Sequence, residues 1–133
     1  MLYVKWPDVA GSIKTAAQAG GDRSLFEVEQ ELMGLSHADI GGCLANAWHL
    51  PVTLREPILH HHAPTLATET TLQTAIVHVA DILVKGLACG NPGDDLIPPL
   101  SRQAWDRLGL DEAALTECIA KASAEFSTID DYL

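Results

Sequence analysis

The stretch from Thr70 to Cys89 constrains the fold of this chain more than any other part of the sequence. Within it, the run from Ala75 to Val84 contains only two polar residues, His78 and Asp81. The stretch is too long for a typical strand, and a helix without a polar face is normally surrounded by other elements. We therefore expect a central, buried helix around which the rest of the chain packs.

Capping residues and glycines predict shorter helices on both sides of this central one. Ser24 with Glu27, and Ser36 with Asp39, have the spacing of a capping box, in which the two side chains bind free N–H groups at a helix start. Pro57 is expected to shorten or kink the helix that contains it. The expected helices cover 7–19, 24–33, 36–48, 52–61, 70–89, 101–108 and 111–126.

Composition agrees with an all-helical chain. Of the 133 residues, 47% are hydrophobic but only 5% are aromatic, and the strong helix formers Ala and Leu predominate. This length suits one domain that buries a core without disulfides or structural metals. The sequence thus predicts an all-α fold, a compact HD-domain-like bundle of about six or seven helices, in a single domain over residues 1–133.

Charge and hydropathy argue against two classes of partner. The net charge is −10, from 18 acidic against 8 basic residues. Such a surface repels phosphate backbones and anionic lipids, so we expect no nucleic-acid binding and no membrane binding. No apolar run approaches about 18 residues, the length of a membrane-spanning helix, and the N-terminus lacks the pattern of a signal peptide.

The three cysteines indicate the compartment. Cys43, Cys89 and Cys118 are far apart, odd in number and without a C-x-x-C pair. They are predicted to be reduced core thiols, as in a cytoplasmic protein.

Histidines and one aspartate are the candidates for metal binding or catalysis. Considered alone, the triplet His60–His62 is most simply explained as a solvated helix end, where histidine meets the helix dipole favourably. Asp81 lies in the most apolar stretch, where a lone carboxylate is costly. It either caps a neighbouring helix or pairs with His78, or it binds a metal beside histidines from other helices; the residues alone leave these alternatives open. His37 and His49 are explained singly as capping, surface or structural residues.

The order of three segments changes this interpretation. They read ELMGLSHADIGGCLANAWHL, PVTLREPILHHHAP and LQTAIVHVADILV. Together they resemble the C-terminal half of an HDOD domain, well over residues 1–90 and only loosely over the helical tail. A tryptophan and a Leu-Pro element match at Trp48 and Leu50-Pro51, and Ile58 sets a register that excludes His60. The family's H-x-x-I-G histidine, His-His pair and final aspartate then correspond to His37, His61, His62 and Asp81.

This resemblance implies an incomplete metal site. HDOD domains are related to HD and HD-GYP metal-dependent phosphohydrolases, whose binuclear site also needs an early histidine and a His-Asp pair. The sequence has no His-Asp dipeptide, and Ala63-Pro64 stand where HD-GYP enzymes have a glutamate and a Gly-Tyr-Pro segment. His37, His61, His62 and Asp81 would hold at most one ion of zinc, iron or manganese.

Three functions are open at this stage. The leading hypothesis is a non-catalytic regulatory and protein-interaction module, like the HDOD domains of bacterial signal transduction. Apolar surface that the absent N-terminal half of the domain would cover predicts a protein partner or a homo-oligomer. The alternative is an HD-type metal-dependent phosphohydrolase with an incomplete or composite metal site. The third is a degenerate fragment whose histidines only satisfy helix ends.

Overall fold

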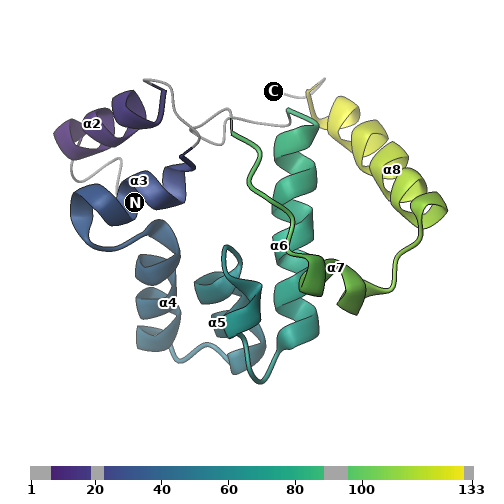
Figure 1. Cartoon of the computed structure of the whole chain (residues 1–133), viewed down its shortest axis with the longest axis horizontal. Helices are drawn as coiled ribbons and strands as arrows, with labels where there is room; N and C mark the ends of the chain where they lie inside the picture. The colour runs from purple at the N-terminus through teal and green to yellow at the C-terminus, as the bar shows by residue number, and fades with distance from the viewer. Residues whose placement is uncertain (1–6, 19–22, 89–95, 131–133) are drawn as a thin grey trace.

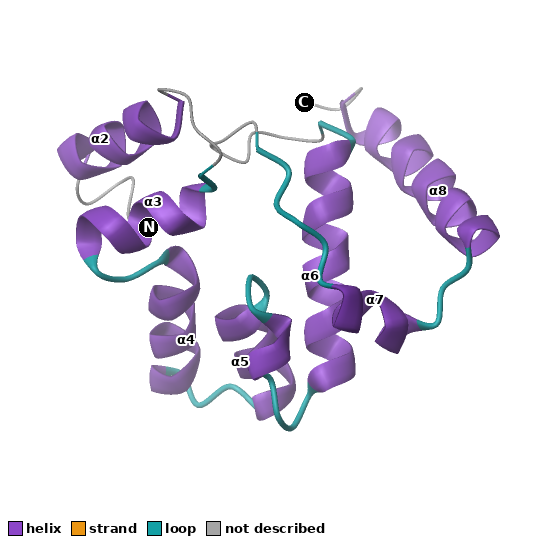
Figure 2. Cartoon of the chain, viewed as in Figure 1, coloured by secondary structure: helices purple, strands orange, loops and turns teal. Residues whose placement is uncertain are grey.

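The computed structural model describes residues 7–18, 23–88 and 96–130, and this part of the chain is helical without strands (Figures 1 and 2). The elements, in order, are α2 (Pro7–Gln18), α3 (Leu25–Met33), α4 (His37–Ala47), α5 (Val52–His60), the 3-10 turn η1 (Pro64–Leu66), α6 (Thr71–Gly86), α7 (Arg102–Leu108) and α8 (Glu112–Asp130). The predicted all-α bundle of about seven helices is confirmed.

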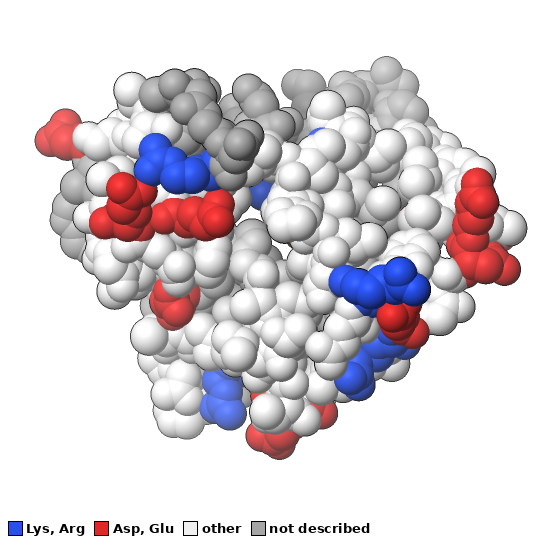
Figure 3. Space-filling view, viewed as in Figure 1, with Lys and Arg blue, Asp and Glu red and all other residues white. Residues whose placement is uncertain are grey.

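The helices pack mostly against their neighbours in sequence. Helix α5 packs between α4 and α6, and α7 packs on α6 with η1. Helices α2 and α3 form a pair at one end of the molecule, where Ile13, Leu25 and Val28 make a core cluster, and α8 lies at the other end (Figure 1). Figure 3 shows that the charged side chains of this face lie mainly around its edge, which leaves an uncharged centre.

Both predicted capping boxes are present. Ser24 and Glu27 open α3, and Gly34 ends it in the left-handed conformation, with φ of 73°. Ser36, which is fully buried, and Asp39 open α4 in the same way. The hydrogen bond from Ser36 is the main reason why the pKa of Asp39 is lowered. These caps make His37 the first residue of α4.

Two glycines set the distance between α4 and α5. A Cβ atom added to Gly41 would lie 2.8 Å from Ile58 Cγ2, and one added to Gly42 would lie 2.7 Å from Leu59 Cδ1. Such distances are shorter than carbon atoms tolerate, so only glycine lets the two helices approach this closely. As a result, the start of α4 lies beside the end of α5. Helix α5 continues through Pro57 to His60, so the proline does not end it early.

The turn before α6 is fixed by Glu56 of α5. Its carboxylate accepts hydrogen bonds from the backbone N–H groups of Thr68, Glu69 and Thr70 and from both threonine hydroxyls. These bonds, first the one from the Thr68 N–H, lower the pKa of Glu56 to about 2. Since Thr70 makes no side-chain cap of its own, Glu56 caps α6 from a neighbouring helix.

Helix α6 is central but not buried on all sides, which corrects the prediction for 70–89. Thr74, Ala75, His78 and Val79 are buried, whereas Ile76 is 51% and Val77 40% exposed. The reason is that α5 and α7 cover only part of its circumference. Its apolar residues on the remaining face line a groove rather than a closed core.

The cysteine prediction is also corrected in part. Cys43 and Cys118 are free thiols, but both are exposed instead of lying in the core. Cys89 and the predicted loop at 91–93 lie outside the described residues. None of the helices that the structure describes is both long and apolar enough to cross a membrane.

Candidate metal centre

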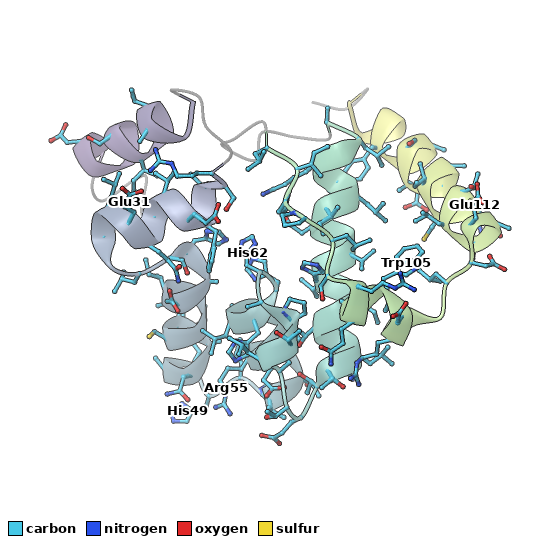
Figure 4. The ribbon with its side chains drawn as sticks, in the orientation of Figure 1. Glu31, His49, Arg55, His62, Trp105 and Glu112 are labelled. Carbon is cyan, nitrogen blue, oxygen red and sulfur yellow. The ribbon has the colours of Figure 1, made fainter. Side chains whose placement is uncertain are left out.

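Three imidazoles meet where α4 begins and α5 ends. His37 Nε2 lies 2.9 Å from His62 Nε2 and 3.3 Å from His61 Nε2. The potential ligand atoms of the three residues all lie within 4.8 Å of one another. Figure 4 shows His62 pointing from the end of α5 into the space between α3 and α6. His37, His61 and His62, which the sequence predicted as ligands, are therefore brought together.

Hydrogen bonds at the far side of two rings fix which nitrogens face the centre. His61 Nδ1 lies 2.8 Å from the carbonyl oxygen of Ile58, and His37 Nδ1 lies 2.5 Å from Glu29 Oε2. Both oxygens are acceptors, so each Nδ1 carries the proton and each Nε2 presents a lone pair. Two lone pairs that face each other at 3.3 Å repel unless a proton or a metal ion lies between them.

The electrostatics favour the neutral rings that bind metals. Burial, followed by the neighbouring His61 and His37, lowers the pKa of His62 to about 3. Burial also lowers the pKa of His61, against the opposing effect of its bond to Ile58. Both rings are thus neutral near pH 7, which leaves their lone pairs available to a cation.

Phe26 of α3 packs against the cluster. Its ring centroid lies 4.7 Å from that of His62 and 6.5 Å from that of His37, with the second pair edge to face. This apolar side restricts how the two imidazoles rotate. Solvent still reaches the site, because the His37 side chain is 40% exposed.

Asp81 lies near the cluster but outside it. It lines the same groove as His37 and His61, and the three-ligand group found among the described residues does not include it. Its carboxylate is 3.9 Å from Lys85 Nζ, and its side chain is 33% exposed, so it is only partly buried. The predicted metal-binding role of Asp81 stays a prediction.

His78 joins three parts of the chain. Its Nδ1 donates to the carbonyl oxygen of His61 at 2.7 Å, and its Nε2 accepts from the backbone N–H of Ser101 at 3.0 Å. It is 4% exposed, and both ring nitrogens are used. The pairing with Asp81 that the sequence allowed is therefore replaced by a link between the end of α5, α6 and the start of α7.

Glu29 is the functional residue that sequence reasoning missed. It is 2% exposed, and it contacts both the ring and the backbone N–H of His37. The signal was present, because Glu29 shares the apolar face of α3 with Leu25 and Val28 at helical spacing. A carboxylate in that position needs a buried partner.

An open apolar groove of about 830 Å³ runs between α5 and α6, with the histidines at its edge. Its lining comprises His37, Thr53, Leu54, Pro57, Ile58, His61, Gln73, Ile76, Val77, Ala80, Asp81 and Val84. Leu54 and Ile76, each about half exposed, belong to this one contiguous apolar surface, which is typical of interaction sites.

The resemblance seen in the sequence rested on three segments, at 31–50, 51–64 and 72–84. Residues 1–64 match the HDOD domain. The HDOD match includes His37, His61 and His62 and ends before Asp81 and α6. No curated protein and no solved structure matches the chain. Residues 1–64 are therefore similar to HDOD domains, and the rest of the chain lies outside this match.

The chemistry of the three donors suits the kind of metal ion that the HDOD resemblance implies. Three imidazole nitrogens suit zinc and iron better than hard cations such as magnesium. A carboxylate behind one ligand and a backbone carbonyl behind another are the usual outer partners of metal-binding histidines. The residues present fit one such ion.

Proposed function

We propose that this chain is a non-catalytic regulatory module of signal transduction. One divalent transition metal ion would hold the start of α4 and the end of α5 together, and the adjacent groove would bind a protein partner. The observation that carries the proposal is the convergence of the three Nε2 atoms at the edge of an exposed apolar groove. Zinc, iron or manganese is the expected ion, in that order of fit to imidazole ligands.

A metal ion at this position would act on the structure of the module. His37 opens α4, whereas His61 and His62 close α5, so one ion would cross-link two helix ends. It would also remove the repulsion between lone pairs that face each other. Because His37 and His61 line the groove, metal binding would stabilise one of its walls.

Hydrolysis by a binuclear mechanism needs more ligands than the site offers. Two ions require a bridging carboxylate and two filled coordination spheres. His37, His61 and His62 form the one group of three potential ligands within the described ranges. A site for one ion argues against the binuclear mechanism.

The groove supports the protein-partner part of the proposal. Its surface is almost entirely apolar, with Asp81 as its one acidic lining residue. Covering large apolar side chains such as Leu54 and Ile76 is favourable by roughly 25 cal/mol per Å². A second copy of the chain is the expected partner, because each copy offers the same apolar wall.

A phosphohydrolase with an incomplete site is the second candidate. It is favoured by the partial exposure of His37 and by the position of Asp81 in the same groove. A bound ion with three protein ligands keeps a coordination position free and would supply a Lewis acid there. Asp81 would then hold or accept a proton beside it.

Elemental analysis of protein purified without a nickel column tests the metal. About one equivalent of zinc, iron or manganese is expected in the wild type and much less in H61A. H60A is the matched control, because His60 is adjacent but outside the cluster. A wild-type protein that takes up no metal would refute this part of the proposal.

Catalysis is tested separately with a generic phosphodiester and added manganese or iron. No turnover is expected. Turnover that is lost in D81N would replace the regulatory proposal with the hydrolase.

A further inference from the structure

Glu29 is a buried carboxylate beside the histidine cluster that the proposed function does not yet use. It lies on the face of α3 that packs into the core and is only 2% exposed. A buried carboxylate destabilises the fold unless hydrogen-bond donors surround it. Its donors therefore indicate what the residue does.

Among the described residues, both donors to Glu29 belong to His37. Glu29 Oε2 accepts from the backbone N–H of His37 at 2.8 Å and from the ring Nδ1–H at 2.5 Å. The first bond satisfies an N–H that every helix start leaves free, here the first residue of α4. A capping role would need only that bond. The second bond acts on the imidazole, whose position and tautomer α4 does not otherwise require.

We infer that Glu29 is the positioning residue of the metal centre: it holds the His37 ring as the Nδ1–H tautomer, with the Nε2 lone pair directed at His61 and His62. The inference rests on the proposed metal-binding function. A charged acceptor behind a ligating imidazole also makes its outer nitrogen a stronger donor to a cation.

The proposed ligands differ in the acceptor that supports each ring. His61 has a neutral carbonyl behind its ring, whereas His37 has a carboxylate. His37 is also the most exposed ring of the three, so it depends most on an external contact to keep its orientation. Without Glu29 the ring of His37 would lose the acceptor that fixes its tautomer, and the edge contact with Phe26 would still limit its rotation. Metal affinity is then expected to fall about 10- to 100-fold.

The test uses the full chain with E29A and E29Q. E31Q is the control, because Glu31 lies on the same helix but is exposed and paired with Arg23. Cobalt(II) is the metal probe, and its dissociation constant is measured by titration. In the metal-free proteins, long-range proton–nitrogen correlation of the imidazoles reports the tautomer of each histidine.

The expected result is a Nδ1–H tautomer for His37 in the wild type that is lost in E29A, together with cobalt binding that is about 10- to 100-fold weaker. The His61 signal should not change, since its acceptor is Ile58. E29Q keeps an acceptor oxygen without the charge, so it should keep the tautomer and bind cobalt less tightly than the wild type. E31Q should behave like the wild type in both measurements.

Two results would overturn the inference: an unchanged His37 tautomer in E29A, or wild-type cobalt affinity in E29Q and E29A. If E29A does not fold, the cobalt affinity of E29Q decides. If the wild type itself binds no cobalt, the proposed metal function fails. The loss or retention of the tautomer in E29A then still decides whether Glu29 positions His37.

Discussion

Removing the Glu56 carboxylate should destabilise the start of α6, and the burial of the N–H groups that it binds sets the magnitude. Thr70 is 4% exposed, so its N–H without an acceptor costs about 1–3 kcal/mol. Thr68 and Glu69 are exposed, and their N–H groups can turn to water at little cost. We expect E56A to lower the free energy of unfolding by about 2 kcal/mol at pH 7, which is within the range for lost helix caps. E56Q keeps one acceptor oxygen and should cost about half as much.

The effect should depend on pH with a defined sign. Its hydrogen bonds lower the pKa of Glu56 from 4.5 to about 2 in the folded chain. A carboxyl group with a lowered pKa stabilises the folded state fully above 4.5 and loses this contribution as the pH falls towards 2. The difference between the wild type and E56A should therefore be constant from about pH 7 to 5 and shrink below that.

Urea unfolding followed by circular dichroism, at about pH 7 and about pH 3, measures both quantities. E69Q is the control, because it changes an exposed carboxylate of the same turn and keeps the backbone N–H that Glu56 binds. Two results would refute the reasoning: wild-type stability of E56A at neutral pH, or a stability loss that is unchanged in acid.

Three further changes test other parts of the fold and the groove. G42A should lower the free energy of unfolding in urea by about 1–3 kcal/mol, because the added methyl group would collide with α5. The control G11A has open space around it and should be neutral or slightly stabilising. I76D should shift the chain towards monomer, measured by light scattering after size exclusion, with little loss of stability. L66D changes an exposed leucine outside the groove and should leave the oligomeric state unchanged. Equal behaviour of the two variants would argue against the groove as the interface. S24A should cost about 1 kcal/mol through loss of the α3 cap, and an unaltered unfolding midpoint would contradict that assignment.

The helix boundaries could be predicted because they are encoded locally. Ser24 and Ser36 with their acidic partners mark helix starts, and Gly34 and Gly109 end helices in the left-handed conformation. These signals need only neighbouring residues and a few backbone angles. The same holds for Asp111, which accepts from the N–H of Ala114 and caps α8 as predicted.

The three clustered histidines could be predicted from a motif register, whereas the contacts that support them came only from the structure. Glu29 and His37 are brought together by the angle between α3 and α4, which no local pattern specifies. The exposed side of α6 was missed because hydrophobicity shows what a residue prefers and not whether a neighbour is present to cover it. Cys43 was placed in the core for the same reason.

The hydrogen bonds of His78 connect the HDOD match with the segment that follows it. The HDOD match stops at residue 64, yet the carbonyl of His61 is held from α6, and the same ring is held in turn by the backbone of Ser101. A movement of α7 would thus be transmitted through the His78 ring to the backbone of His61. The segment after the match is therefore tied by hydrogen bonds to the backbone beside the histidine cluster, and the two parts fold against each other.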